Sequence, residues 1–177
     1  ENYPLSLRGN AENSFVTHIC ETGTGHFYFT LDRKGLYRFD FAGHEINEIP
    51  VTRSAGLTSI TAITYIRGTN EIWIANEGTG KIYVYTENGS GLVLKQVLPL
   101  QVNNDNSISI FFEDRNRDVW IGSNSGLFKK TYNGKVLSIP FTYKFINSIV
   151  QDKAGDIWVG TEKNGLFRLK KDPKKPG

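Results

Sequence analysis

The chain has 177 residues, of which 38% are hydrophobic and 22% charged, and its formal net charge is +3. This composition is ordinary for a globular protein with an apolar core, and no apolar run is long enough to form a membrane-spanning helix. Four of the 21 basic residues lie in the last eight positions, so the rest of the chain is nearly neutral. We therefore expect no nucleic acid partner for this segment and a basic tail or linker at 172–177.

The numbers of cysteine and methionine residues further limit what kind of protein this chain is. Cys20 is the single cysteine, which excludes an intrachain disulfide and argues against a thiol-ligated zinc site. The sequence contains no methionine, even at position 1, and no recognisable signal peptide. We therefore expect the chain to be a processed or excerpted piece of a longer protein.

The predicted elements repeat along the chain. A short strand is expected at 3–8, and four similar phrases follow, each with an aromatic residue in a strand and a glycine in the next turn. The phrases are HFYFTLDRKGLYRFD (26–40), EIWIANEGTGKIYVY (71–85), DVWIGSNSGLFKK (118–130) and DIWVGTEKNGLFRL (156–169). The aromatic residues are Tyr28, Trp73, Trp120 and Trp158, and the glycines are Gly35, Gly80, Gly126 and Gly165. Successive glycines are 45, 46 and 39 residues apart, which predicts four copies of one structural unit.

Each unit reads as strand, tight hairpin, strand, tight hairpin, strand. Its first strand carries two apolar residues three positions apart: Val16 and Ile19, Ile60 and Ile63, Ile108 and Phe111, Ile146 and Ile149. A fourth strand is predicted at 44–51, 92–100 and 135–141. Four strands in roughly 40–45 residues is the size of one β-propeller blade. The predicted fold class is therefore all-β, built from antiparallel β-propeller blades.

The repeat also suggests boundaries for a propeller segment at 1–171. We place an outer strand in 1–13, blades at 14–57, 58–105 and 106–144, and a partial blade at 145–171. Two arrangements remain open: the N-terminal strand completes the last blade and closes a small ring, or the chain is an arc of a larger propeller. Because an arc leaves sheet edges and faces unpaired, we expect it to self-associate.

The repeat resembles the two-component regulator propeller repeat, in which I-x-x-I-x-x-D-x-x-G-x-I-W-I-G-T-x-x-G-L is followed by an aromatic and a basic residue. The fit is close in INSIVQDKAGDIWVGTEKNGLFRL and good in ISIFFEDRNRDVWIGSNSGLFKK. The second copy departs from the pattern with Ala75 in place of Gly, and the first has Thr22 where the Asp is expected.

The resemblance implies a sensor segment of a membrane-bound hybrid two-component regulator, on the periplasmic or extracytoplasmic side of a bacterial inner membrane. It implies an oligosaccharide or another small ligand. It also implies that any histidine kinase activity and any membrane contact belong to parts of the parent protein outside this sequence. We expect this segment itself to be non-enzymatic and to carry no cofactor.

Loops on one edge of the blades are the predicted ligand-binding elements, because a propeller holds such loops rigidly. They comprise the turns between the second and third strands and the connections between blades at 52–58, 101–107 and 142–145. The turn residues chosen as candidates are Asp32, Arg33, Lys34, Asn76, Glu77, Ser123, Asn124, Glu162, Lys163 and Asn164. Their composition suits sugar hydroxyls, and it equally suits any solvated loop.

Two other sets of residues could form binding sites. The repeated aromatic residues favour packing between blades over sugar stacking, because each occupies one fixed position of the unit. Asp114 and Asp152 favour hydrogen bonds to their own turns over calcium binding, so no metal site is expected.

Two alternatives to a sensor remain. One is a stand-alone lectin or protein-interaction propeller. The other is a metal-assisted propeller lyase, for which His18, His26 and His44 are the histidines available.

Overall fold

The computed structural model describes residues 15–41, 45–89, 91–100 and 107–171. The predicted strand at 3–8 and the predicted basic tail at 172–177 lie outside the described residues. Within the described residues, fifteen strands form four antiparallel sheets, and one short helix, α1 (Pro50–Ser54), connects the first two sheets.

Each sheet is one blade, and its strands follow one another in chain order. Blade 1 contains β1 (Val16–Glu21), β2 (Phe27–Leu31), β3 (Gly35–Asp40) and β4 (Glu45–Glu48). Blade 2 contains β5 (Ile60–Ile66), β6 (Glu71–Asn76), β7 (Lys81–Asn88) and β8 (Gly91–Pro99). Blade 3 contains β9 (Ile108–Glu113), β10 (Val119–Ser123), β11 (Leu127–Lys130) and β12 (Val136–Ile139). Blade 4 contains β13 (Ile146–Gln151), β14 (Ile157–Thr161) and β15 (Gly165–Leu169). The predicted all-β propeller fold and the order of its strands are confirmed.

Alternation along each second strand explains how the blades stack. In β14, Ile157 and Val159 are buried, and they pack with Ile146 and Ile149 against Trp120 of blade 3. Trp158 and Gly160 point to the opposite side, because successive residues of a strand face opposite ways. One side of each blade is therefore shaped to pack against a preceding blade, and the other side against a following blade.

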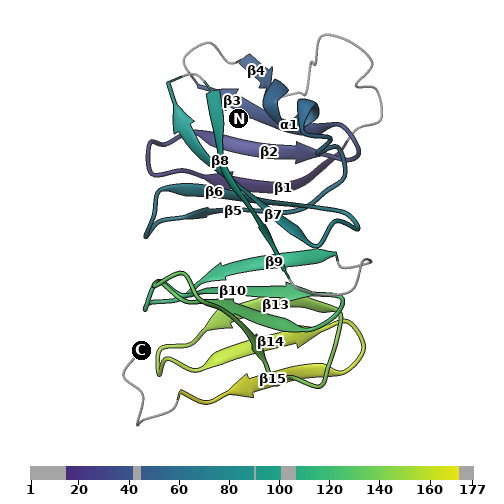
Figure 1. Ribbon diagram of the computed structural model, residues 1–177, viewed down its shortest axis with the longest axis vertical. Helices are drawn as coiled ribbons and strands as arrows, with labels where there is room; N and C mark the ends of the chain where they lie inside the picture. Colours follow the sequence, from purple (N-terminus) through teal and green to yellow (C-terminus); the bar gives the residue numbers. More distant parts are fainter. Residues whose placement is uncertain (1–14, 42–44, 90, 101–106, 172–177) are drawn as a thin grey trace.

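The four blades lie in a row, from blade 1 at the top of Figure 1 to blade 4 at the bottom. Successive first strands contact one another, β1 with β5, β5 with β9 and β9 with β13. Three apolar clusters fill the spaces between successive blades. Blades 1 and 4 lie at opposite ends of this four-bladed arrangement, so the described residues form an arc (Figure 1).

The two end blades expose apolar residues that the inner blades bury. Leu166 is 64% exposed, although its equivalents in blades 2 and 3, Ile82 and Leu127, are each 1% exposed. At the other end, Val16 and Ile19 are 45% and 63% exposed. The end at blade 1 is only partly open, because Phe29, Leu31 and Tyr37 of that blade are buried. Among the described residues, no neighbouring blade covers the exposed side chains at either end.

The connection after blade 1 differs from the prediction. A strand was predicted over 44–51 and a loop over 52–58, but β4 ends at Glu48 and α1 begins at Pro50. Proline fits the first position of a helix because its missing N–H would have no intrahelical partner there. Ile49 and Leu57, on either side of the helix, are buried. The α1 helix therefore anchors the crossing from blade 1 to blade 2.

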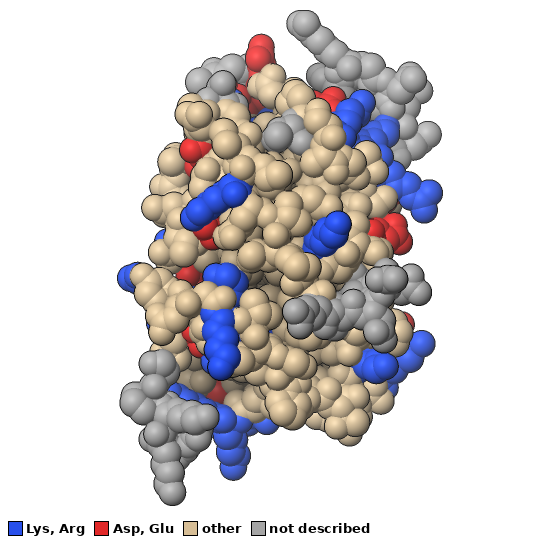
Figure 2. Space-filling view, viewed as in Figure 1, with Lys and Arg blue, Asp and Glu red and all other residues tan. Residues whose placement is uncertain are grey.

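Surface charge is dispersed over the blades. Figure 2 shows Lys and Arg side chains scattered singly or in small groups over the face drawn there. Helix α1 is five residues long, and the described residues contain no helix that is both long and apolar enough for a membrane span.

Candidate functional site

The turns between the second and third strands of the blades lie on one edge of the arc, here called the second-turn edge. In every blade, the backbone N–H of one turn residue donates to the carbonyl of the residue just before the first strand. The pairs are Asp32 to Phe15 (3.2 Å), Glu77 to Ser59 (2.9 Å), Asn124 to Ser107 (3.1 Å) and Glu162 to Phe145 (2.9 Å). This repeated bond joins each turn to the connection that enters its blade, as the sequence predicted for a shared edge.

The middle pair of turns is tied together. The Gly78 N–H donates to Ser107 Oγ (3.1 Å), and the Ser107 N–H donates to Asn124 Oδ1 (3.2 Å). Ser123 is buried, and its Oγ accepts the N–H of Ser125 in its own turn. Asn124 and Ser123 therefore have structural roles at this edge. The Oδ1 atom of Asn76 is buried there without a hydrogen-bond partner.

The other candidate residues lie near the two ends of the arc. Asp32, Arg33 and the partly exposed Lys34 belong to blade 1. Glu162, Lys163 and Asn164 belong to blade 4 and are exposed, and Lys163 lies 5.9 Å from the Phe145 ring centre. Since blades 1 and 4 are at opposite ends (Figure 1), the fold does not gather all ten candidates into one site.

The repeated aromatic residues are held by carboxylates. Trp120 Nε1 donates to Asp114 Oδ2 and Trp158 Nε1 donates to Asp152 Oδ2, each at 2.8 Å. Trp73 Nε1 donates to Glu71 (3.0 Å), and the Tyr28 hydroxyl donates to Glu87 of blade 2 (3.0 Å). These contacts explain why the aromatic residue recurs. For Trp120 and Trp158 the sequence signal is an Asp six positions before the Trp, which our interpretation assigned only to the turn.

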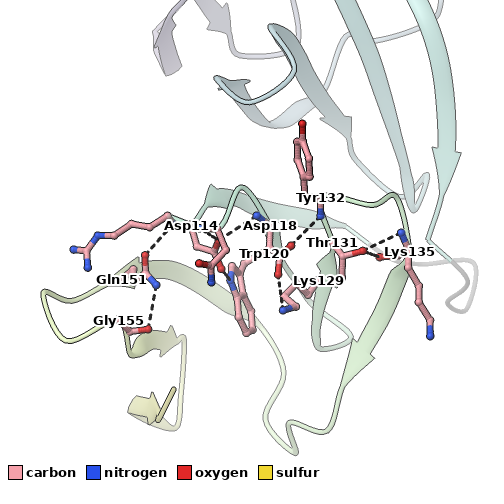
Figure 3. A network of polar contacts seen from close by, with 11 residues as sticks. Asp114, Asp118, Trp120, Lys129, Thr131, Tyr132, Lys135, Gln151 and Gly155 are labelled. Carbon is pink, nitrogen blue, oxygen red and sulfur yellow. Dashed lines mark hydrogen bonds and ion pairs between the residues drawn. The ribbon is translucent and has the colours of Figure 1, made fainter. Parts of the chain in front are cut away.

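The turn role predicted for the two aspartates is also present. Asp114 Oδ1 accepts the N–H groups of Asn116 (2.8 Å) and Asp118 (3.1 Å), and Asp152 Oδ1 accepts the N–H of Asp156 (3.0 Å). The Trp158 indole, with these turn N–H groups, lowers the pKa of Asp152 below its usual value. Figure 3 shows Asp114 with Trp120 at this part of blade 3, and Gln151 and Gly155 of blade 4 beside them. Each such aspartate joins a turn to an aromatic ring.

A second carboxylate stands two positions before each Trp and binds a basic residue. Asp118 pairs with Lys129 (2.7 Å) and Asp156 with Arg168 (2.6 Å). Glu71 pairs with Lys95 (2.6 Å). Burial opposes ionisation of Glu71, but hydrogen bonds from Lys95, Trp73 and Thr69 outweigh it and lower the pKa. These ion pairs brace the strands of one blade.

The turns between the first and second strands form the opposite edge, here called the first-turn edge. A cleft of about 400 Å³ opens there between blades 2, 3 and 4, within the usual range for small-molecule sites. Its lining consists of Arg67, Gly68, Phe112, Glu113, Asp114, Arg115, Arg117 and Gln151. None of these residues was among the ten candidates, because the sequence interpretation placed ligand binding at the second-turn edge.

In blades 3 and 4, the last residue of the first strand reaches the turn of the preceding blade and so builds the cleft. Glu113 accepts the N–H groups of Arg67 (2.7 Å) and Gly68 (2.8 Å). Gln151 Oε1 accepts the N–H of Arg115 (3.0 Å). The Glu113 carboxylate and the Gln151 amide are thus bound to backbone groups, while the arginines of the lining are exposed.

The two described histidines lie in blade 1. His18 Nδ1 is 3.2 Å from Thr30 Oγ1, and burial lowers the pKa of His18. His26 Nδ1 is 2.7 Å from Glu87 Oε1 in a contact that joins blades 1 and 2. Within the described ranges, no three His, Cys, Asp or Glu side chains are grouped to hold a metal ion. His44 lies outside the described residues.

Comparison with known proteins places the repeat in a family. Residues 140–163 match the family model described as two component regulator propeller, so the resemblance read from the motif is confirmed for blade 4. Over 75 residues the chain is 31% identical to histidine kinase P4 of Formosa agariphila, a match that covers 36% of the chain and 6% of that kinase.

Solved structures share the fold. The extracellular domain of the hybrid two component system BT4673 from B. thetaiotaomicron has a TM-score of 0.69 at 21% identity, covering 93% of this chain and 22% of that one. The corresponding domain of BT3049 from the same organism has a TM-score of 0.67 at 21% identity, covering 88% and 20%. A streptogramin B lyase has a TM-score of 0.63 at 17% identity, covering 86% and 53%. The chain thus has the fold of four β-propeller blades and spans about a fifth of the length of the two extracellular domains that it matches, and its residues 140–163 match the two component regulator propeller repeat.

Proposed function

We propose that this chain is a ligand-binding segment of the extracytoplasmic sensor of a membrane-bound hybrid two-component regulator, and that it responds to oligosaccharides without catalysing a reaction. The observation that carries the proposal is the family match at residues 140–163. The shared fold of two hybrid-system extracellular domains supports it. The periplasmic side of a bacterial inner membrane is the location that this role requires.

The structure supports a binding role because the repeated motif residues are used for packing, which leaves the residues of the turns available for a ligand. The motif aromatics and their carboxylates are engaged in packing and hydrogen bonds, as in Trp120 with Asp114 and Trp158 with Asp152. The blades therefore hold the turns of both edges in fixed positions. The cleft offers guanidinium groups and the ring of Phe112, a combination that binds polar, ring-shaped ligands.

Incubation of the chain with neutral and acidic oligosaccharides tests this proposal. Equilibrium dialysis should show saturable binding of at least one of them. Mass spectrometry of the recovered ligand should show that it is unchanged. Cleaved or rearranged sugar would identify an enzyme, and the absence of saturable binding to every oligosaccharide would contradict the sensor role.

We also propose that the segment self-associates through its end blades, with a second copy as the occupant. Leu166 and Val150 lie on the same side of blade 4 and are 64% and 55% exposed. In blades 1 to 3 the equivalent side packs against the first strand of the next blade. Within the described residues, β1 is the first strand that no preceding blade covers, so blade 4 of one copy fits blade 1 of another in a head-to-tail contact.

A further inference from the structure

One backbone position is unusual in the first-turn edge. The residue three positions before the repeated aromatic residue has a positive φ in all four blades. These residues are Gly25 (81°), Asn70 (54°), Arg117 (64°) and Gly155 (93°). Glycine, and to a smaller extent asparagine, adopt this left-handed conformation readily, but a long side chain does so at a cost. Arginine is therefore a poor choice for the turn of blade 3, and a local outlier of this kind points to a role outside folding.

The residue with this unusual backbone conformation also lines the cleft. Arg117 lines the cleft together with Arg67 and Arg115, which come from two neighbouring turns. Its guanidinium carbon is 5.7 Å from the centre of the Tyr132 ring, which steadies the side chain. Three arginines thus line one opening between blades.

The acidic residues of the lining are already engaged. Both carboxylate oxygens of Glu113 accept backbone N–H groups of the blade 2 turn. Asp114 is 7% exposed and accepts the Trp120 indole and two turn N–H groups. Among the described residues, no carboxylate forms an ion pair with Arg67, Arg115 or Arg117. Arg115 Nη1 donates to the carbonyl of Lys153 (3.2 Å), and this bond uses one of its five N–H donors. The three arginines therefore keep N–H groups and positive charge for an anion from solution.

The wall of the cleft is made without a side chain at Gly68. A Cβ atom on this residue would lie 2.8 Å from Glu113 Oε1 and 3.1 Å from Arg117 Cδ. Glycine at this position lets Glu113 and Arg117 approach the blade 2 backbone. The opening between the arginines depends on this close approach.

We propose that this cleft binds an oxyanion, namely a carboxylate or sulfate group carried by the ligand. Arginine is suited to both groups because its planar N–H groups form paired, charge-assisted hydrogen bonds with their oxygens. That the oxyanion is carried on a sugar rests on the proposed function. The sugar ligand is then an acidic one, and the first-turn edge is where the protein recognises its charged group.

Amide chemical shifts of the labelled chain provide the test, with glucuronate, glucose 6-sulfate and glucose as probes. Glucuronate or glucose 6-sulfate should shift the amides of Gly68 and Arg115 saturably, and glucose should not. A response to glucuronate alone identifies a carboxylate ligand, and a response to glucose 6-sulfate alone identifies a sulfate ligand. The affinity should fall as salt is added, because the attraction is ionic.

The Arg117→Gly variant separates binding from folding, since glycine suits the left-handed turn. It should melt at the wild-type temperature or above, and it should bind the anionic probe about tenfold more weakly through loss of a charge-assisted contact. Two controls should bind as the wild type does. Asn70→Gly relieves the same conformation without removing a charge, and Arg53→Ala removes an exposed arginine of blade 1 that pairs with Glu48.

Failure of this inference can be distinguished from failure of the proposed function. Wild-type binding of the anions by Arg117→Gly, or absence of binding of both anions, would overturn the oxyanion site. If neutral oligosaccharides then bind saturably, the sensor proposal stands and its ligand is uncharged. If no sugar of any kind binds, both proposals are overturned.

Discussion

Single residues in this chain show how a repeated motif becomes a repeated contact. The indole N–H of Trp120 is buried in the blade and needs an acceptor, because an unpaired buried donor is costly. Asp114, six positions earlier, supplies that acceptor and also accepts the turn N–H groups of Asn116 and Asp118. Removal of either partner therefore leaves a polar group without its bond.

A double-mutant cycle of Trp120→Phe and Asp114→Asn measures this contact. Each single variant should lose about 1–3 kcal/mol of unfolding free energy, the cost of leaving a buried polar group unsatisfied. The double variant should lose less than the sum, because the two residues act through one bond. Urea unfolding followed by tryptophan fluorescence gives the values. Strict additivity would show that the indole–carboxylate bond contributes nothing.

Acid should weaken blade 4 through Asp156. The N–H of Lys171 and the guanidinium of Arg168 hold the pKa of this carboxyl below its usual value. A carboxyl whose pKa is lower in the folded state stabilises the fold at pH values above its pKa in the unfolded state, which is about 3.9. This stabilisation is lost as the pH falls through the pKa of the folded state.

Melting temperatures measured from pH 7 to pH 2 provide the check. The wild type should lose stability below about pH 4. Asp156→Asn should be less stable at pH 7 and should show a weaker decline in the acid range. An identical acid slope in both proteins would rule out this carboxyl as a contributor.

At the scale of elements, the hairpin between β9 and β10 combines a stability cost with a proposed function. Arg117 in its turn has φ of 64°, where blade 4 has Gly155. Arg117→Gly should raise the free energy of unfolding by up to about 1 kcal/mol, because the left-handed conformation is costly for a side chain. Denaturant unfolding tests this. A loss of more than about 1 kcal/mol would mean that the arginine is needed for the fold.

Much of the element order could be predicted from the sequence, since period-two alternation and turn residues determine it. The aromatic in β14 and the positive-φ Gly165 after it lie where the pattern predicts. Helix α1 was missed because Pro50 follows an apparent strand, and the burial of Ile49 and Leu57 that anchors it is a tertiary effect.

The cleft was missed for a similar physical reason. Glu113 and Gln151 look like ordinary ends of strands, and their bonds go to the turns of the preceding blades. Only the stacking of blades brings Arg67 beside Arg117, across about fifty positions of sequence. The one local signal was an arginine in a turn position where two other repeats have glycine.

At the scale of the whole molecule, the described residues form an arc with exposed apolar side chains at both ends. Leu166 is 64% exposed at one end and Ile19 is 63% exposed at the other. Burial of such side chains against a second copy is favourable by about 25 cal/mol per Å² of apolar surface. The proposed head-to-tail association should therefore depend on Leu166.

Leu166→Asp should shift the chain toward monomer in sedimentation velocity, because a carboxylate would be buried in the contact. Leu94→Asp is the matched control, since Leu94 is 40% exposed on the outer strand of blade 2. This control should keep the wild-type distribution. A wild-type chain that is monomeric at all concentrations would refute the head-to-tail contact.

Calorimetric titration of the wild-type chain with neutral and acidic oligosaccharides tests the central claim of a ligand-binding sensor segment most directly. Saturable heat is expected with at least one acidic oligosaccharide, and Arg117→Gly should bind that oligosaccharide about tenfold more weakly. Heats of dilution alone across the whole series would contradict it.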